Sequence, residues 1–384
     1  MAQNPERSAL GAKVSAHLAR LVLILIALVP AFAQQQRISS PQVNPDRTVT
    51  FRLRAPGAQT VMLAREGAKP VPMTKDEQGV WTLSTAPLDP DLYGYSFVVD
   101  GVALIDPANA LIKPNLLTPQ SMVHVPGSAL PWEVADVPHG TIHRHSYKST
   151  VVGDQRDFFV YTPAAYDPKG RTRYPVLYLL HGFSDDASGW TAVGRAHVIL
   201  DNLIAQGKAR PMIVVMPLGY GAPEILQGGF GAFRNQELRQ RNFTKFREAL
   251  LAEVLPQVER SYRVSLDRKD RAIAGLSMGG AESLLTGLNH VDKFAWVGAF
   301  STGGLGDGFE QAFPSIGERV NGELRLLWIA CGTEDSLIEN NRQLARYLKS
   351  KNVQLTYVET PGAHTWLVWR RYLAEFAPML FKSR

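Results

Sequence analysis

Residues 271–280 read R-A-I-A-G-L-S-M-G-G and contain the pattern G-x-S-x-G, with Ser277 at its centre. A short apolar run precedes the serine, and a helix-like stretch, residues 281–288, follows it. In a strand–turn–helix of this kind the serine occupies a strained turn that exposes its Oγ at the end of a sheet. We expect Gly275 and Gly279 at the flanks because side chains there would collide with the neighbouring strand and helix. The pattern therefore predicts a nucleophilic serine.

A serine nucleophile needs a base that takes its proton and an acid that orients the base. Where this turn occurs, the chain order is Ser, then Asp or Glu, then His. Two of the nine histidines follow Ser277, namely His290 and His364. His290 comes just after the helix expected behind the serine, which suits a surface role. His364 lies in a loop after the apolar run 353–358, and we predict that it is the base.

The acid is expected in the loop after the preceding apolar run, residues 324–330, where the chain reads C-G-T-E-D at 331–335. Both Glu334 and Asp335 could orient the histidine. Asp335 is favoured because aspartate is the more common partner in such triads. Cys331 is the single cysteine of the chain, so it cannot form an internal disulfide, and we expect it to be a buried small residue.

Backbone N–H groups that bind the developing oxyanion complete such a site. One donor is expected to be Met278, the residue after the serine. The other is expected in the loop that follows the run 174–180, where Phe183 is preferred and Gly182 is the alternative. His181 could be a base, but it precedes the serine in the chain and is expected to shape this loop instead.

The rest of the chain predicts the fold around these motifs. Continuous apolar runs at 174–180, 212–216, 271–274, 295–300, 324–330 and 353–358 are typical of buried parallel strands. Helical stretches at 244–262, 340–349 and 366–381 lie between or after them. Earlier in the chain, short alternating segments at 48–54, 61–63, 80–83, 93–99 and 121–125 are separated by turns. The prediction is an α/β domain with a mostly parallel sheet, preceded by a small β-sandwich domain.

The N-terminal residues have the features of a targeting segment. Arg7, Lys13 and Arg20 precede a nine-residue apolar run at 21–29, and an A-x-A site ends at Ala33. This order predicts a secretory signal peptide over residues 1–33 and a secreted or periplasmic protein. The run is shorter than the roughly 20 residues of a membrane span, so we expect no stable membrane insertion after cleavage.

The composition is that of a globular protein. The chain has 384 residues, 45% of them hydrophobic and 20% charged, which excludes a disordered or disulfide-stapled protein. The formal net charge is +6, and the basic residues are scattered along the chain. A nucleic-acid partner is therefore not expected.

Four motifs together resemble a known family. They are L-L-H-G-x7-W at 179–190, A-G-L-S-M-G-G at 274–280, C-G-T-E-D-S-L-I at 331–338 and G-A-H-T-W-L-V-W at 362–369. From about residue 147 onward the chain resembles the esterase-D-like α/β-hydrolases, and is most similar to carbohydrate esterase family one, the feruloyl and acetylxylan esterases. The resemblance implies an α/β-hydrolase fold, a triad of Ser277, Asp335 and His364, and an oxyanion N–H from Phe183.

The N-terminal strands resemble the early-set, immunoglobulin-like modules that precede some of these esterases. The matching stretches are V-T-F-R-L-R-A-P at 49–56, G-V-W-T at 79–82, Y-G-Y-S-F-V-V-D-G at 93–101 and D-P-A-N at 106–109. The expected organisation is a signal peptide at 1–33, this module at 38–126, a linker at 127–146 and the esterase domain at 147–384. The module could bind carbohydrate or shape the entrance of the active site.

The expected function is that of an exported serine esterase that works through an acyl-enzyme. The substrate would be a plant-wall polysaccharide ester, feruloyl or acetyl, although a small-molecule ester remains open. Trp190, Tyr220 and Trp366 are expected to contact it. No metal or organic cofactor is required. The alternatives are a ferric-siderophore esterase, an acyltransferase to a sugar hydroxyl, and a non-catalytic carbohydrate-binding protein. The oligomeric state is left open.

Overall fold

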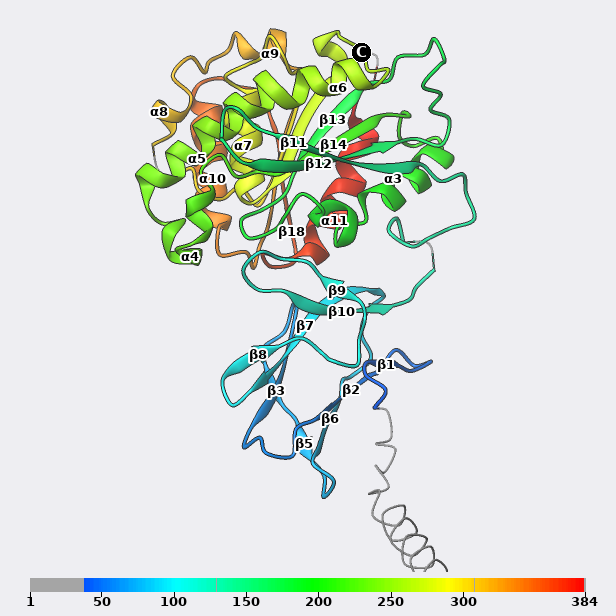
Figure 1. The fold of residues 1–384 in the computed structure, drawn as a ribbon. Coiled ribbons are helices and arrows are strands. Elements are labelled where there is room, and N and C mark those ends of the chain that lie inside the picture. Colours follow the sequence, from blue (N-terminus) through cyan, green and yellow to red (C-terminus); the bar gives the residue numbers. More distant parts are fainter. Residues whose placement is uncertain (1–37, 129, 307, 383–384) are drawn as a thin grey trace, which may run out of the picture. The chain divides into compact units, whose positions relative to one another are not determined.

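The computed structural model describes residues 38–128, 130–306 and 308–382. The predicted signal peptide, residues 1–33, lies outside these described residues. Ser40–Arg384 group into one unit by their contacts, and the unit contains a β-sandwich followed by an α/β domain (Figure 1). No helix of the described residues combines the length and apolar character that crossing a bilayer demands.

The β-sandwich is built from two antiparallel sheets. The first has the strand order β1 (Gln42–Val43), β2 (Val49–Arg54), β6 (Val80–Ser84) and β5 (Thr74–Lys75). The second has the order β4 (Val71–Pro72), β3 (Val61–Arg65), β7 (Asp91–Val99), β10 (Gln120–Val125) and β9 (Ile112–Lys113), with β8 (Val102–Leu104) paired to β7. Phe51 of the first sheet meets Tyr95 of the second edge-on, with ring centroids 4.7 Å apart. Alternate residues of both sheets form this core, as the period-two pattern predicts.

The α/β domain is organised around an eight-stranded sheet. Its order is β11 (Thr141–Lys148), β12 (Gln155–Thr162), β14 (Ile213–Pro217), β13 (Val176–Leu180), β15 (Arg271–Leu276), β16 (Trp296–Phe300), β17 (Leu326–Gly332) and β18 (Thr356–Thr360). The first two strands are antiparallel to their neighbours, and all other pairs are parallel. This confirms the predicted α/β-hydrolase fold with a mostly parallel sheet and a preceding β-sandwich.

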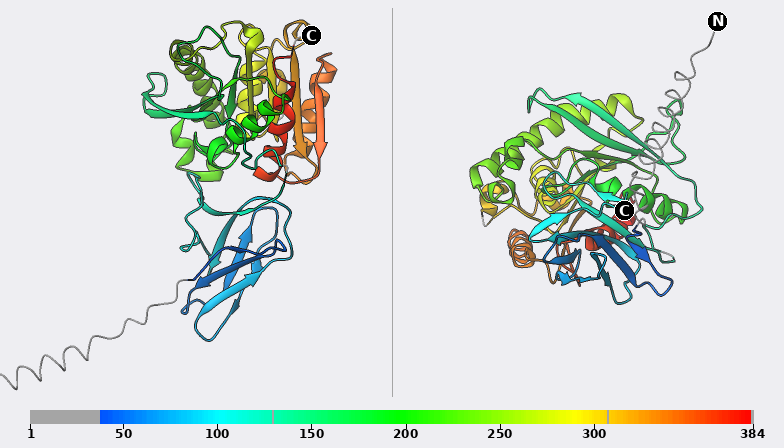
Figure 2. Two further views of the ribbon diagram at one scale, coloured as in Figure 1. Left: turned by 90° about the vertical axis from the view of Figure 1, so that its right-hand side faces the viewer. Right: turned by 60° about the horizontal axis from the view of Figure 1, so that its bottom comes forward.

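Helices cover both faces of this sheet (Figure 2). One face packs against α3 (Ala196–Ala205) and α11 (Trp366–Phe376). The other packs against α5 (Gln236–Ala249), α6 (Leu255–Ser261), α7 (Met278–Gly287) and α10 (Ile338–Ser350). The π-helical segment Leu250–Val254 joins α5 to α6 without a break. The short helices are α2 (Gly189–Ala192), α4 (Gly229–Ala232), α8 (Phe309–Ala312), α9 (Val320–Glu323) and the 3₁₀ turns Pro223–Leu226, Arg268–Asp270 and Ala377–Met379. Because both faces of the sheet are covered, the inner strands β13, β14 and β16 are buried and apolar along their length, whereas the edge strand β18 is partly exposed.

Two boundaries differ from the sequence-based expectation. The segment expected to be a linker, residues 127–146, contains the first part of β11, which pairs with β12 along its whole length. This edge strand is mostly exposed and polar, so it lacks the apolar run that marks the other strands. The last helix ends at Phe376 rather than near residue 381. Pro378, which lacks a backbone N–H, follows in a 3₁₀ turn.

Candidate active site

Ser277 occupies the turn between β15 and α7, at the carboxyl end of the sheet. Its backbone has φ 52° and ψ −114°, a region that residues other than glycine seldom adopt. The turn is held by two backbone bonds. Ser277 N–H donates to Phe300 O at 2.8 Å, and Gly303 N–H donates to Ser277 O at 2.9 Å. Neighbouring β16 and the loop after it therefore hold the serine in its strained conformation.

The two glycines of the pattern are required by close backbone contacts. A Cβ on Gly275 would lie 2.4 Å from Gly279 O and 2.8 Å from Leu180 Cβ. A Cβ on Gly279 would lie 2.5 Å from His181 O and 2.7 Å from Leu180 O. These distances are shorter than real Cβ contacts. The obstructing carbonyls belong to α7 for Gly275, and to β13 and the loop after it for Gly279. The helix behind Ser277 can approach β13 this closely only because both positions are glycine.

The structure brings Ser277, His364 and Asp335 into one hydrogen-bonded chain. His364 Nε2 lies 3.0 Å from Ser277 Oγ, and His364 Nδ1 lies 2.8 Å from Asp335 Oδ2. The tautomer that satisfies both contacts donates Nδ1–H to the carboxylate and accepts the serine O–H at Nε2. The Trp369 ring packs against the imidazole in a T-shaped arrangement, with ring centroids 4.8 Å apart. The arrangement allows a proton to move from Ser277 to His364.

Asp335 is buried and ionised in this arrangement. Burial alone would raise its pKa, but hydrogen bonds from His364, Leu337 N–H and Ser301 outweigh burial and lower the pKa below its ordinary value. Glu334, the alternative acid, is exposed to solvent. Cys331 is buried, which raises the pKa of its thiol to about 12. Of the two candidate carboxylates, Asp335 is the one that contacts the histidine.

The loop after β13 lies directly against the serine. A Cβ on Gly182 would be 3.4 Å from Ser277 Cβ, and Phe183 follows it. His181 fixes this loop: its Nδ1–H donates to Gly182 O at 2.8 Å, and its Nε2 accepts Gly219 N–H at 2.9 Å. Burial lowers the pKa of His181 to about 4, so it stays neutral and structural, in the loop-shaping role predicted for it.

Two backbone N–H groups near Ser277 are suited to bind an oxyanion. Met278 is the first residue of α7, where a backbone N–H has no acceptor within the helix. The helix dipole at this end also favours negative charge. Phe183, on the opposite loop, is the second expected donor. Phe183 lines the same cavity as Ser277, and the assignment of Met278 and Phe183 as the donors stays a prediction.

A cavity of about 660 Å³ opens at Ser277 and His364. This volume is within the range of small-molecule sites. An aromatic wall, composed of Phe183, Phe230 and Phe233, forms one side. The centroid of the Phe183 ring lies 4.7 Å from the centroid of the Phe233 ring and 5.4 Å from that of the Phe230 ring. Arg239 fixes this wall, because its Nη1 donates to Phe233 O at 2.9 Å and its Nε donates to Gly304 O at 2.7 Å.

Two of the three predicted substrate contacts are corrected by the structure. Trp190 is fully buried, and its Nε1–H donates to Leu180 O at 2.8 Å. Tyr220 is also buried, and its hydroxyl donates to Asp185 O at 3.0 Å. Both side chains hold the end of β13 and the loop after it through these hydrogen bonds. Trp366 lines the cavity, and its contact with a substrate stays a prediction.

Sequence reasoning missed several cavity residues. Asp185 lies in the loop after β13, and burial raises its pKa to about 7. Its place two residues after Phe183 could have drawn attention to it. Arg239 and Asn340 of the α/β domain also line the cavity. A further group comes from the β-sandwich and the arm between its last strands, and no motif marks it. Its members are Glu66, Lys113, Asn115, Thr118 and Gln120.

Comparison with known proteins gives the same chemistry. The sequence profile of the family described as putative esterase matches residues 149–380. An endo-1,4-beta-xylanase/feruloyl esterase of Xylanibacter ruminicola is 31% identical over 363 residues, which is 92% of this chain and 47% of that protein. An acetyl esterase of Caldicellulosiruptor saccharolyticus is 25% identical over 231 residues, 52% of this chain and 80% of that protein. The chain thus spans about half the length of the first of these relatives.

Solved structures share the architecture. A ferulic acid esterase from Anaeromyces mucronatus superposes with a TM-score of 0.56 at 25% identity, covering 65% of this chain and 93% of that one. The enterobactin esterase from Shigella flexneri superposes with a TM-score of 0.63 at 19% identity, covering 86% of this chain and 92% of that one. At that identity the second likeness concerns the fold alone, and it extends over both the β-sandwich and the α/β domain.

Proposed function

The chain belongs to the family of putative esterases, and from that premise we propose that it is a serine carboxylic-ester hydrolase that works through an acyl-enzyme. The observation that carries the proposal is the hydrogen-bonded chain from Ser277 Oγ through His364 to Asp335. This chain opens into a cavity large enough for an ester substrate. The relatives named as feruloyl esterase and acetyl esterase support the same reaction class.

The proposed reaction follows from the positions of these groups. Ser277 Oγ attacks the ester carbonyl while His364 Nε2 takes its proton. The charge on the carbonyl oxygen is stabilised by the N–H groups of Met278 and Phe183, each worth about 3–4 kcal/mol. His364 then donates its proton to the leaving alkoxide, and an acyl-serine remains. Water, deprotonated by His364, then attacks the acyl-serine. The acyl–Oγ bond breaks, the acid leaves, and His364 returns the proton to Ser277 Oγ. Asp335 orients the imidazole and stabilises its protonated form in both steps.

We further propose an aromatic acyl group, such as feruloyl, on a plant-wall polysaccharide. The support is the aromatic wall of Phe183, Phe230 and Phe233 beside Ser277, together with the xylanase/feruloyl esterase relative. Offset or edge-on ring pairs contribute about 0.5–1.5 kcal/mol beyond their buried area. An acetyl group has no ring to place against this wall.

The first test is product release from methyl ferulate, acetylated xylan and p-nitrophenyl acetate, with Ser277→Ala as control. We expect the wild-type protein to release ferulate and the variant to lose about 10⁶-fold in kcat. Cleavage of p-nitrophenyl acetate without ferulate release would keep the mechanism and reject the feruloyl substrate. Inertness toward all three esters would reject the esterase.

A second test separates the aromatic wall from the catalytic chemistry. Phe233→Ala should raise KM for methyl ferulate by about threefold to tenfold, from the loss of one ring pair. The same variant should change KM for p-nitrophenyl acetate by less than twofold, because that acyl group does not reach the wall. Equal effects on both substrates would reject this placement of the acyl group.

We also propose that the protein is exported to the periplasm or the medium, on the strength of residues 1–33. Mass spectrometry of the exported protein should give an N-terminus at Gln34. Recovery of the uncleaved chain from the cytoplasm alone would contradict this.

A further inference from the structure

Helix α11 begins at Trp366, two residues after His364, and lacks a cap of its own. In α11, all of whose residues the structure describes, the N-cap residue Thr365 makes no side-chain capping hydrogen bond, and the first turn contains no acidic residue. The first backbone N–H groups of a helix have no intrahelical acceptor, and a buried donor left unpaired is costly. The helix that follows the histidine loop therefore needs an acceptor from elsewhere.

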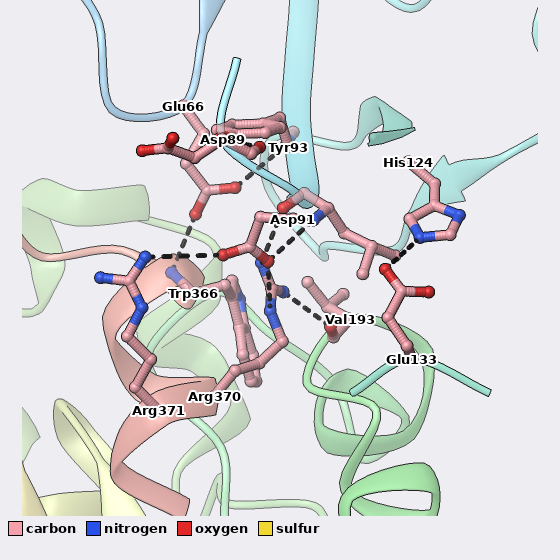
Figure 3. Close-up of polar contacts among 12 residues, drawn as sticks. Glu66, Asp89, Asp91, Tyr93, His124, Glu133, Val193, Trp366, Arg370 and Arg371 are labelled. Atoms are coloured by element: carbon pink, nitrogen blue, oxygen red, sulfur yellow. Dashed lines mark hydrogen bonds and ion pairs between the residues drawn. The ribbon is translucent and has the colours of Figure 1, made fainter. Parts of the chain in front are cut away.

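Glu66, which directly follows β3 of the β-sandwich, supplies this acceptor (Figure 3). Its Oε1 accepts Trp366 N–H at 2.8 Å, although the two residues are 300 positions apart. Its Oε2 accepts Gly94 N–H at 3.0 Å and lies 3.8 Å from Lys113 Nζ. Only 7% of the side chain is exposed. A carboxylate at a helix N-terminus is also favoured by the helix dipole.

The β-sandwich holds Glu66 rigidly in this position. Its backbone N–H donates to Gly94 O at 2.8 Å, so backbone and side chain are both bound to the same residue of β7. A Cβ on Gly94 would lie 3.3 Å from Glu66 Oε2 and 3.0 Å from Gln120 Oε1. Gly94 therefore leaves the space that the carboxylate occupies.

One face of α11 continues this contact with the β-sandwich. Leu367 packs against the core of the sandwich, and its Cδ1 is 3.1 Å from where a Cβ on Gly67 would be. One turn later, the Arg370 guanidinium binds Asp91 and Leu92 O. The opposite face of the helix packs into the α/β domain. The helix behind the histidine loop is thus fixed from two sides.

We propose that Glu66 is a positioning residue for His364, acting across the two domains. The link is short: Thr365 N–H donates to Ala363 O at 2.8 Å, so residues 363–365 form a tight turn around His364. Fixing Trp366 N–H fixes the far end of that turn. Asp335 and Trp369 orient the imidazole ring, while Glu66 sets the backbone that carries it. Small displacements of a catalytic base lower the rate strongly. The inference rests on the proposed esterase function.

The test compares Glu66→Ala and Glu66→Gln with Glu77→Ala, which removes an exposed carboxylate from the turn before β6. Hydrolysis of p-nitrophenyl acetate is measured per active serine, counted with a phosphonylating reagent. Glu66→Ala should lower kcat about tenfold or more and change KM less than twofold. Glu66→Gln should recover part of the loss, because one amide oxygen can still accept one of the two N–H groups. A fold-disrupting effect would lower the number of active serines rather than the rate of each.

Hydrogen exchange gives a second readout that does not depend on activity. The Trp366 amide should exchange faster in Glu66→Ala than in Glu77→Ala, while the amide of Leu373, within α11, stays protected. The proposal is overturned if Glu66→Ala keeps kcat within twofold of Glu77→Ala. If Glu66→Ala does not fold, Glu66→Gln is used instead, and the proposal is overturned if its kcat is within twofold of that of Glu77→Ala. An inert wild-type protein would reject the esterase function and this role with it, whereas an active wild type with an unaffected Glu66 variant rejects this role alone.

Discussion

Asp91 and Arg370 are 279 positions apart in the sequence, and their side chains form an ion pair that solvent does not reach. Arg370 Nη2 lies 2.8 Å from Asp91 Oδ1, and the side chains are 0% and 1% exposed. Arg370 Nε donates to the same carboxylate oxygen at 3.1 Å. Other guanidinium N–H groups donate to Leu92 O at 2.6 Å and to Val193 O at 2.9 Å (Figure 3). The pair joins the β-sandwich to the helix that follows the histidine loop.

Arg370→Met should lower the free energy of unfolding by about 3–5 kcal/mol, because it removes the buried cation that is hydrogen-bonded to the buried carboxylate of Asp91. The matched control is Arg371→Met. Arg371 is half exposed and lies 3.9 Å from the same carboxylate, so its removal should cost less than about 1 kcal/mol. Denaturant unfolding measures both. Equal losses in the free energy of unfolding would show that the buried ion pair stabilises the fold no more than the exposed one.

Asp335→Asn should lower kcat by about 10³–10⁴-fold with little change in KM, because an amide cannot stabilise the protonated imidazole. Glu334→Gln is the control, since it neutralises the adjacent exposed carboxylate. The kcat of Glu334→Gln should stay within about twofold of the wild-type value. Steady-state kinetics on p-nitrophenyl acetate distinguish the two, and a large loss in Glu334→Gln instead would reassign the acid.

Gly279→Ala should lower kcat/KM at least tenfold and destabilise the fold by about 1–3 kcal/mol, as overpacking does. The new methyl would meet the carbonyl oxygens of Leu180 and His181, which the sheet holds in place. Gly317→Ala is the control, because no atom of the described residues lies within 4 Å of its Cβ position. It should leave activity and melting temperature unchanged. If Gly279→Ala behaved like the wild type, the turn between β15 and α7 would have room for an additional methyl group.

Asp185 should make stability depend on pH. Burial raises its pKa from 3.8 to about 7, so between about pH 4 and 7 the folded protein binds a proton that the unfolded chain releases. Its contribution to stability is therefore greatest below pH 4 and is lost as pH rises through 7. Asp185→Asn should gain stability over wild type across this window, up to about 4 kcal/mol at pH 8. Unfolding at several pH values measures the difference, which would stay constant with pH if Asp185 titrated normally.

The sequence alone was sufficient for the parts of the site that local chemistry determines. The turn at Ser277 needs glycines at 275 and 279, and parallel strands bring their carboxyl ends together, so the loops of Asp335 and His364 could be placed beside it. No sequence motif indicates whether an aromatic side chain points into the cavity or into the core. Trp190 follows the loop after β13 and Tyr220 follows β14, so both were expected at the site, yet both side chains are buried.

Contacts between the domains were beyond the reach of sequence patterns. Glu66 directly follows a strand of the β-sandwich, and Arg370 is one of two consecutive arginines in a mostly apolar helix. Each becomes informative only when the β-sandwich docks on α11, and no periodicity encodes that docking. The same reasoning explains why the cavity residues Lys113, Asn115 and Gln120 were not foreseen.

The bond between Glu66 and Trp366 also has a consequence for biosynthesis. At roughly 5–20 residues per second, a ribosome makes Trp366 about 15–60 s after Glu66. The β-sandwich is complete long before the helix that it must hold has been translated. A nascent chain that has already formed the serine turn still lacks its base, and it acquires an ordered histidine only when α11 has emerged and docked. The catalytic triad is therefore expected to be completed late, only after α11 has been made and has docked on the β-sandwich.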